Sequence, residues 1–188
     1  MFARRAGQLA LVLSLILLAV ATRLLPHPPN FVPTGAMALF GAAALPKRWL
    51  AVLVPLLAYY LSDLVLNNVV YASYFEGFYL GADPYVYGGL ILMIALGIWS
   101  LRGQTFSWMR IGGTAVGATL IFFLVSNFGV WAGGMVYPVT AGGLLAAYVA
   151  GLPFMMNSLL ANLLFTGVFF AAGRRAGLFS RSYFATAR

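Results

Sequence analysis

Residues 26–46 read PHPPNFVPTGAMALFGAAALP, and they join a proline-rich loop to an apolar run of only about 12 residues, from Gly35 to Pro46. An α-helix of that length is roughly 18 Å long, which is shorter than the hydrocarbon core of a bilayer. Proline lacks a backbone N–H, and non-helical backbone at membrane depth is tolerated only where protein buries it or a cavity solvates it. The stretch therefore predicts a short second helix that begins below the surface and a loop at 26–34 that lines a cavity.

The composition predicts an all-α integral membrane protein. Hydrophobic residues make up 63% of the 188 positions and charged residues 7%, a balance that soluble domains of this size do not reach. Each span needs roughly 20 apolar residues, so we expect one six-helix membrane domain over 1–188, with the lipid bilayer around it. The apolar runs between charges place the transmembrane helices at 7–25, 35–46, 49–66, 85–101, 111–132 and 154–173.

The positive charges predict how these helices are oriented. Six spans put both termini on one side, and ten of the eleven basic residues fall on that side, which the positive-inside rule identifies as the cytoplasm. They are Arg4, Arg5, Lys47, Arg48, Arg102, Arg110, Arg174, Arg175, Arg181 and Arg188. Arg23 is the exception, near the outer end of the first span. We therefore expect a membrane protein with cytoplasmic termini, and we interpret the net charge of +8 as this bias rather than as a nucleic-acid surface.

The outer side holds the irregular segments. The first apolar run is interpreted as a retained helix rather than a cleaved signal. The loop at 67–84 carries five aromatic residues, which fits either an interfacial aromatic belt or a lid over a ligand. Residues 133–153 are too few to cross the membrane and return, so we expect a helix at the outer interface or dipping inward. A turn at Gly151–Pro153 would then lead into the last span.

Asp63 lies inside a predicted span, where a carboxylate is costly unless it has a function or a partner. It could contact a ligand, or it could tie helices together through a salt bridge to Arg23 or a hydrogen bond to the His27 loop. The residues of the chain leave these alternatives open.

Side-chain amides mark the last two predicted spans. Asn127 and Trp131 share a helix face near the outer end of the fifth span, and Asn157 lies at a similar level in the sixth. These positions are better candidates for a ligand site than the deeper pair, Asn162 and Thr166, which is typical of hydrogen bonds between membrane helices.

The residue types argue against catalysis and against a resident metal. The chain has no cysteine, and the single histidine, His27, cannot by itself form a zinc site, which takes three or four ligands. The HExxH, P-loop and GxSxG patterns are absent. We therefore expect no enzymatic activity, no intrinsic cofactor and no metal held by the protein itself. An acid–base pair of His27 and Asp63 is the enzymatic alternative.

Five blocks of the sequence carry a family resemblance: HPPNFVPTGAMALFGAAALP at 27–46, YYLSDL at 59–64, YVYGGL at 85–90, FFLVSNFGVWAGGMVYP at 122–138 and GLPFMMNSLLANLLFTGVFF at 151–170. With these blocks the chain resembles the substrate-binding S-components of energy-coupling factor (ECF) vitamin transporters over nearly its whole length. Among them it is most similar to the BtuM-type cobalamin proteins. The resemblance implies a six-helix fold with a ligand pocket open to the outside.

The resemblance also implies which residues bind substrate and partners. It carries over His27, Asn30, Asp63, Tyr85, Tyr87 and Asn127 as pocket residues, and their neighbours Phe31, Asn67, Trp131, Tyr137 and Asn157 complete the predicted site. Ala6 and Ala10 match the AxxxA pattern with which S-components dock on a membrane subunit driven by two ATPases. BtuM-type members are often solitary, so the chain could also work without them.

The implied ligand is a vitamin-like micronutrient, cobalamin or a related corrinoid first. Another small vitamin or a modified-base precursor is the alternative, and a purely structural subunit is a further one. Many cobalamin-binding members ligate cobalt with a cysteine that this chain lacks, and Met156 and Asn162 stand where an arginine and an aspartate are common. Cobalamin would therefore bind through His27, as a ligand to its cobalt or as a hydrogen-bond donor, or by shape alone.

Overall fold

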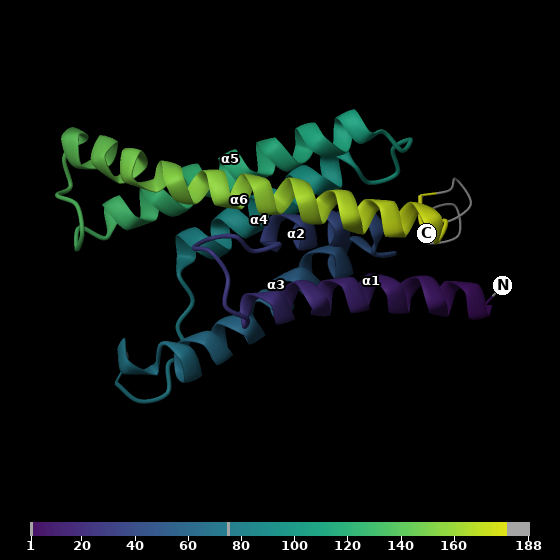
Figure 1. The fold of residues 1–188 in the computed structure, drawn as a ribbon, viewed down its shortest axis with the longest axis horizontal. Coiled ribbons are helices and arrows are strands. Elements are labelled where there is room, and N and C mark those ends of the chain that lie inside the picture. The colour runs from purple at the N-terminus through teal and green to yellow at the C-terminus, as the bar shows by residue number, and fades with distance from the viewer. Residues whose placement is uncertain (1, 75, 180–188) are drawn as a thin grey trace.

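Six α-helices make up most of the chain, and their order follows the predicted apolar runs (Figure 1). The computed structural model describes residues 2–74 and 76–179, with side chains described from residue 6 onward. The helices are α1 (Phe2–Arg23), α2 (Thr34–Ala44), α3 (Arg48–Val65), α4 (Pro84–Ser100), α5 (Trp108–Ala132) and α6 (Ala141–Arg175). A π-helical turn, η1 (Leu66–Val70), and a 3-10 turn, η2 (Ala72–Tyr74), follow α3. No strand occurs in this described part, which confirms the all-α prediction.

The short helix α2 is the centre of the bundle. Each of its residues is buried, and it contacts all five other helices. Its sequence, TGAMALFGAAA, consists mostly of small residues, so the neighbouring helices approach its backbone closely. Gly97 of α4 shows this, because a Cβ at that position would lie 2.8 Å from the Cβ of Ala42. The prediction of a short second helix is confirmed, and its brevity reflects a position inside the protein.

Both ends of α2 are satisfied by polar side chains from other helices. The first N–H groups and last carbonyls of a helix have no partner within it, and leaving them unpaired in an apolar core is costly. Arg102 donates to the carbonyls of Ala42, Leu45 and Pro46 at 3.0, 2.9 and 2.6 Å. At the other end, Asn162 Oδ1 accepts from the backbone N–H of Gly35 at 2.9 Å. These bonds allow an isolated helix end to lie in the interior.

The predicted turn at Gly151–Pro153 is wrong, because α6 runs through it as one helix from Ala141 to Arg175. Proline inside a helix costs about 3 kcal/mol in isolation, but here α5 packs against α6 beside this point. Gly151 makes that packing close, since a Cβ there would lie 2.5 Å from Asn127 Oδ1. Thr140 caps the first turn by accepting from Gly143 N–H at 3.1 Å. The 35 residues form a helix roughly 52 Å long.

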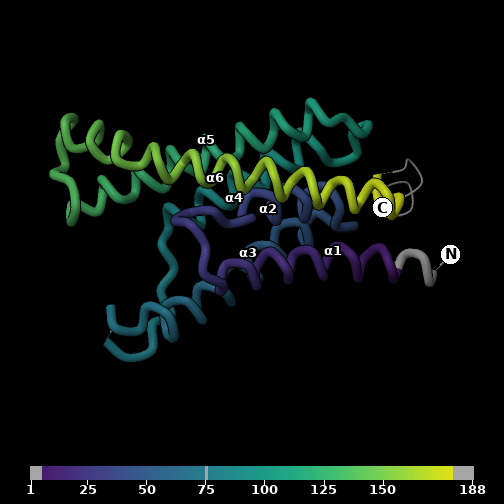
Figure 2. Tube along the Cα trace, viewed as in Figure 1, coloured from purple at the N-terminus to yellow at the C-terminus, as the bar shows by residue number. Residues whose placement is uncertain are grey.

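The two ends of the bundle differ in the segments that they hold (Figure 2). Helix α1 begins and α6 finishes at one of them, the terminal end. The segments 24–33, 66–83 and 133–140 lie toward the other end, called here the open end, where the α5–α6 connection and the segment after α3 diverge. Among the described residues, four helical stretches are long and apolar enough to cross a membrane, namely α1, α3 with η1, α5 and α6. Of the basic residues used to predict orientation, Arg181 and Arg188 lie outside the described residues, as do the side chains of Arg4 and Arg5.

Candidate functional site

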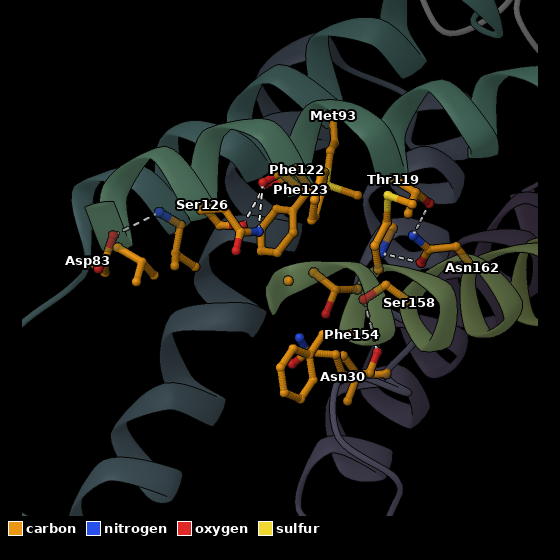
Figure 3. A pocket seen from close by; sticks show the side chains of 18 of the residues that line it. Asn30, Asp83, Met93, Thr119, Phe122, Phe123, Ser126, Phe154, Ser158 and Asn162 are labelled. Atoms are coloured by element: carbon orange, nitrogen blue, oxygen red, sulfur yellow. Dashed lines mark hydrogen bonds between the residues drawn. The ribbon is translucent and has the colours of Figure 1, made fainter. Parts of the chain in front are cut away.

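A cavity of about 540 Å³ lies at the open end, between the 24–33 loop and helices α3, α4, α5 and α6 (Figure 3). Sites that bind small molecules occupy about 300–1,000 Å³ and combine apolar walls with a few polar groups. The floor of the cavity is lined by buried residues, namely Thr34, Gly35, Met93, Thr119 and Asn162. The mouth is lined by exposed or half-buried ones, including His27, Asn30, Tyr71, Asp83 and Tyr137. The cavity therefore has the size and the polarity gradient of a ligand site.

The floor of the cavity is a hydrogen-bonded contact between three helices. Asn162 of α6 accepts from the Gly35 N–H of α2 at 2.9 Å and donates from Nδ2 to Thr119 Oγ1 of α5 at 2.8 Å. Thr119 in turn donates to the carbonyl of Ala115 at 2.9 Å. Position 35 has no space for a side chain, because the amide of Asn162 occupies it. The prediction that Asn162 joins helices is confirmed, and the same residue lines the cavity.

Thr166, which the sequence likewise predicted to form hydrogen bonds between helices, lies one turn further along α6. It is 2% exposed, and its hydroxyl has no hydrogen-bond partner among the described residues. Thr166 therefore does not join helices through a hydrogen bond of its side chain.

A partly buried ion pair forms the wall beside the first helix. Arg23, whose side chain is 9% exposed, donates from Nη2 to Asp63 Oδ1 at 2.7 Å. The same guanidinium donates to the Tyr59 carbonyl at 3.2 Å and to the Ser62 hydroxyl, and it lies 3.7 Å from the centre of the Tyr59 ring. Arg23 and Tyr59 line the cavity. The pair joins α1 to α3 where each helix ends or nears its end.

Asp63 serves this tie between helices. Its second oxygen accepts from the Tyr87 hydroxyl at 2.8 Å, which brings α4 into the same cluster. Both carboxylate oxygens thus have a partner, and Asp63 is behind the residues that line the cavity. Of the alternatives that the sequence left open for Asp63, the salt bridge to Arg23 is confirmed.

The 24–33 loop presents His27 and Asn30 to the cavity. His27 Nδ1 lies 2.9 Å from the Pro28 carbonyl, and because a carbonyl only accepts, Nδ1 is the donor of this bond. Asn30 has a φ of 59°, in the left-handed region that asparagine tolerates better than most residues. Two residues of α6 hold the loop, since Asn157 donates to the Pro29 carbonyl at 2.9 Å and Ser158 to the Asn30 carbonyl at 3.2 Å.

Four of the predicted substrate residues line the cavity, namely His27, Asn30, Asn127 and Tyr137. Asn127 donates from Nδ2 to the Phe123 carbonyl at 2.9 Å, so its Oδ1 is the group turned toward α6. His27 and Asn30 lie far in the sequence from Asn127 and Tyr137. The structure therefore brings part of the predicted site together.

The other predicted residues lie outside the lining. Asp63, Tyr87 and Asn157 make the ties described above, and Asn67 is half-buried in η1. Phe31 packs edge-on against Phe165 with ring centres 6.3 Å apart. Tyr85 packs on Phe128 at 5.8 Å, and Trp131 donates to the Thr140 carbonyl at 3.0 Å. Most of these contacts hold the helices and loops that form the cavity.

Sequence reasoning missed the aromatic and polar residues that α5 and α6 contribute to the walls. Phe122 and Phe123 of α5 and Phe154 of α6 line the cavity (Figure 3), as do Ser126 and Ser158. A signal for the α5 face existed, because Phe122 and Ser126, like Phe123 and Asn127, are four residues apart and therefore neighbours on the helix. The signal for α6 was hidden by the predicted turn at Gly151–Pro153.

Hydrogen bonds tie the segment that follows α3 to that helix. Asn68 donates to the Leu64 and Tyr79 carbonyls at 2.9 Å each and accepts from the Tyr79 N–H at 2.6 Å. Tyr60 also donates to the Leu80 carbonyl at 3.1 Å. Tyr74 and Phe78 are 81% and 71% exposed, which fits either a belt or an open lid.

Two further predicted groups concern partners and metals. Ala6 and Ala10 are exposed on α1, so they are accessible to a docking subunit. No group of three or more His, Cys, Asp or Glu side chains that could hold a metal ion occurs in the part of the chain that the structure describes.

Comparison with known proteins yields one family. The model of a family of unknown function, DUF6580, matches residues 4–183. No curated protein and no solved structure matches the chain significantly.

Proposed function

We propose that this chain, which belongs to the family of unknown function DUF6580, is an S-component-like membrane protein that binds a vitamin-like micronutrient for uptake. One observation carries the proposal: a cavity of about 540 Å³ with aromatic walls and an amide at its floor, formed by helix ends and loops at one end of an apolar bundle. A rigid scaffold of apolar helices that presents such a cavity is suited to binding and release of a small molecule.

The membrane placement is part of the proposal. We place the chain in the bacterial inner membrane with the terminal end in the cytoplasm, because the described basic side chains other than Arg23 cluster there. These are Lys47 and Arg48 where α3 begins, Arg102 just after α4, Arg110 in the first turn of α5, and Arg174 and Arg175 where α6 ends. The cavity then opens to the outside, where a scarce nutrient is captured.

Cobalamin is the first candidate ligand, because the chain resembles the BtuM-type cobalamin proteins. A corrinoid with its nucleotide tail is larger than a drug-sized molecule, and a cavity within the 300–1,000 Å³ class encloses ligands of drug size. Cobalamin would therefore lie partly outside the cavity, with His27 Nε2 at the mouth as a nitrogen able to approach cobalt. The volume favours the second candidate, a smaller vitamin or a modified-base precursor.

The same resemblance suggests how uptake would be energised. Exposed Ala6 and Ala10 on α1 would contact an ECF membrane subunit driven by ATPases, or the chain would act alone. The acid–base alternative is disfavoured, because both oxygens of Asp63 already accept hydrogen bonds from Arg23 and Tyr87. A carboxylate that holds helices together is poorly placed to move protons to a ligand.

The test is the detection of a bound small molecule. The protein is purified in lipid nanodiscs from cells grown in rich medium with cobalamin, and native mass spectrometry measures any added mass. Saturable binding of cyanocobalamin is followed by its absorbance. We expect a bound small molecule. Protein that carries no added mass, and that binds neither cyanocobalamin nor a panel of other vitamins, would refute the proposal.

A matched pair of variants links the ligand to the cavity. Ala150 lines the cavity, while Ala146 is outside the lining, and both are exposed on α6. Ala150→Trp should fill part of the cavity and weaken binding at least about tenfold, which is a loss of about 1.4 kcal/mol. Ala146→Trp should leave binding unchanged. Equal effects of the two variants would place the ligand elsewhere.

A further inference from the structure

We infer that the ligand of this cavity is an uncharged, planar ring compound with a lactam edge, that is, a cyclic amide presenting a C=O acceptor beside an N–H donor. The inference rests on the proposed binding function and specifies its ligand. Three properties of the lining carry it: the state of its charged groups, its aromatic side chains and its amides.

The charge of the lining is already compensated. Arg23 is the one Lys or Arg among the described lining residues, and its guanidinium is bound to Asp63 at 2.7 Å and stacked on Tyr59 at 3.7 Å. A ligand carboxylate or phosphate would have to compete with Asp63 for that cation. Moving a charged group out of water without a free partner is expensive. An anionic ligand therefore gains little from this wall.

A cationic ligand is matched no better. Asp83 is the one carboxylate among the described lining residues, and it is exposed at the mouth. Its Oδ1 caps α4 by accepting from the Tyr85 and Val86 N–H groups at 2.8 and 3.0 Å. A carboxylate at the N-terminus of a helix is stabilised there by the helix dipole and is screened by solvent. The interior of the cavity offers no negative charge of its own.

The aromatic lining favours a planar shape. Phe122 and Phe123 on α5 and Phe154 on α6 line the cavity from two helices (Figure 3). Tyr59 and Tyr137 add rings from two further segments. Aromatic rings stack favourably on flat π-systems and pack less well around branched or flexible chains. With about 540 Å³ of space, a ligand of two or three fused rings would contact several of these rings at once.

The amides select the edge of that ring system. Asn162 uses one lone pair on Oδ1 and one hydrogen on Nδ2 to hold Gly35 and Thr119, so its second lone pair and second hydrogen are still available. Asn127 donates to its own helix and keeps Oδ1 as an acceptor. Carboxamides present a donor and an acceptor together, which is the complement of a lactam. A ligand without such an edge would leave this donor and acceptor unpaired and shielded from water, and that loss weakens its binding.

The experiment compares uncharged lactams with matched acids on the unmodified protein in nanodiscs. Isothermal titration calorimetry measures binding of pterin, lumazine and guanine, which are uncharged planar lactams near neutral pH. Pterin-6-carboxylate and guanylate are the matched anions of pterin and guanine, thiamine is the aromatic cation, and cyanocobalamin is the large ligand. We expect at least one lactam to bind saturably, and its matched acid to bind about tenfold or more weakly.

Two results separate this inference from the proposed function. Binding of an acid, thiamine or cyanocobalamin without binding of any lactam would overturn the inference and leave the binding function standing. No binding by any of these compounds, together with an empty protein in native mass spectrometry, would overturn both. A ligand that copurifies counts in the same way: an uncharged lactam supports the inference, and a charged or non-planar molecule overturns it.

Discussion

Arg23 and Asp63 show how one residue pair can be both structural and part of a site. Arg23 is the basic residue that departs from the charge bias of the sequence, and the structure gives it a carboxylate, a carbonyl, a hydroxyl and an aromatic ring as partners. Removing one member of a buried pair leaves the other charge uncompensated, which costs more than the pair itself contributes. The pair thus joins helices that form the cavity wall, and Asp63 also compensates the positive charge that Arg23 brings to the cavity lining.

The Asp63→Asn variant should lower the free energy of unfolding by about 2–3 kcal/mol, because Arg23 would stay buried without its counter-charge. Thermal or denaturant unfolding in detergent measures the loss. The double variant Arg23→Gln with Asp63→Asn should recover part of it, since no charge is then left unpaired. A single variant as stable as the wild type would show that solvent, and not Asp63, satisfies Arg23.

Asn162 and Thr166 are a natural pair for testing the cavity floor, because they lie one turn apart on α6 and both are buried. Asn162→Leu removes bonds to Gly35 and Thr119 and should destabilise the protein by about 1–3 kcal/mol. Thr166→Val removes a hydroxyl without a partner among the described residues and should be neutral or stabilise by up to about 1 kcal/mol. Unfolding measured under identical conditions compares the two, and equal losses would contradict the assigned bonds.

At the scale of the element, α2 and α6 depart in opposite ways from a helix of membrane length. Helix α2 has 11 residues and is wholly buried, while α6 has 35 and runs beyond its neighbours (Figure 1). A short helix is stable inside the bundle because Arg102 and Asn162 satisfy its ends. A long helix persists through Pro153 because α5 supports it on one side.

The close approach of α4 to α2 predicts the effect of two glycine substitutions. Gly97→Ala places a Cβ 2.8 Å from that of Ala42 and should destabilise by about 1–3 kcal/mol through overpacking. Gly112→Ala on α5 meets nothing within 4 Å and should stabilise by up to about 1 kcal/mol, the helix-propensity difference. Unfolding midpoints in the same detergent give the comparison. A harmless Gly97→Ala would mean that the two helices can separate at low cost.

At the scale of the whole molecule, charge and cavity occupy opposite ends. The described cations other than Arg23 lie toward the terminal end, and the cavity lies toward the open end; the buried helix α2 stands between them, with Gly35 at the cavity floor and Arg102 bound to the carbonyls at its other end. Such an arrangement suits a protein that captures a ligand on one face of a membrane and is held in orientation by its charges on the other.

The absence of cysteine makes this orientation directly testable. Ala141→Cys at the start of α6 should react with a membrane-impermeant maleimide added to spheroplasts, because we place the open end outside. Gln104→Cys, between α4 and α5, should react only after the membrane is permeabilised. Labelling is read as a mass shift of the purified protein. The reverse pattern would invert the proposed topology.

The sequence by itself determined the helical class, the helix order and the short second helix, because these follow from local runs of apolar residues and from proline and glycine in loops. It also indicated that Asp63 needs a partner and that Asn162 joins helices. It misjudged α6, since Gly151 and Pro153 are helix breakers only where no neighbour compensates. Local patterns of this kind carry no information about which surfaces pack together.

The tertiary structure alone decided which residues share the cavity. Asn127 and Tyr137 line it with His27 and Asn30, while Tyr85, Tyr87 and Trp131 make contacts with Phe128, Asp63 and the Thr140 carbonyl instead. Thr34 and Gly35 became its floor only because α2 is buried at the centre, with Asn162 and Thr119 beside it. Periodicity assigns residues to a face of one helix, but a cavity depends on how the faces of several helices meet, and that is settled by packing across the whole chain.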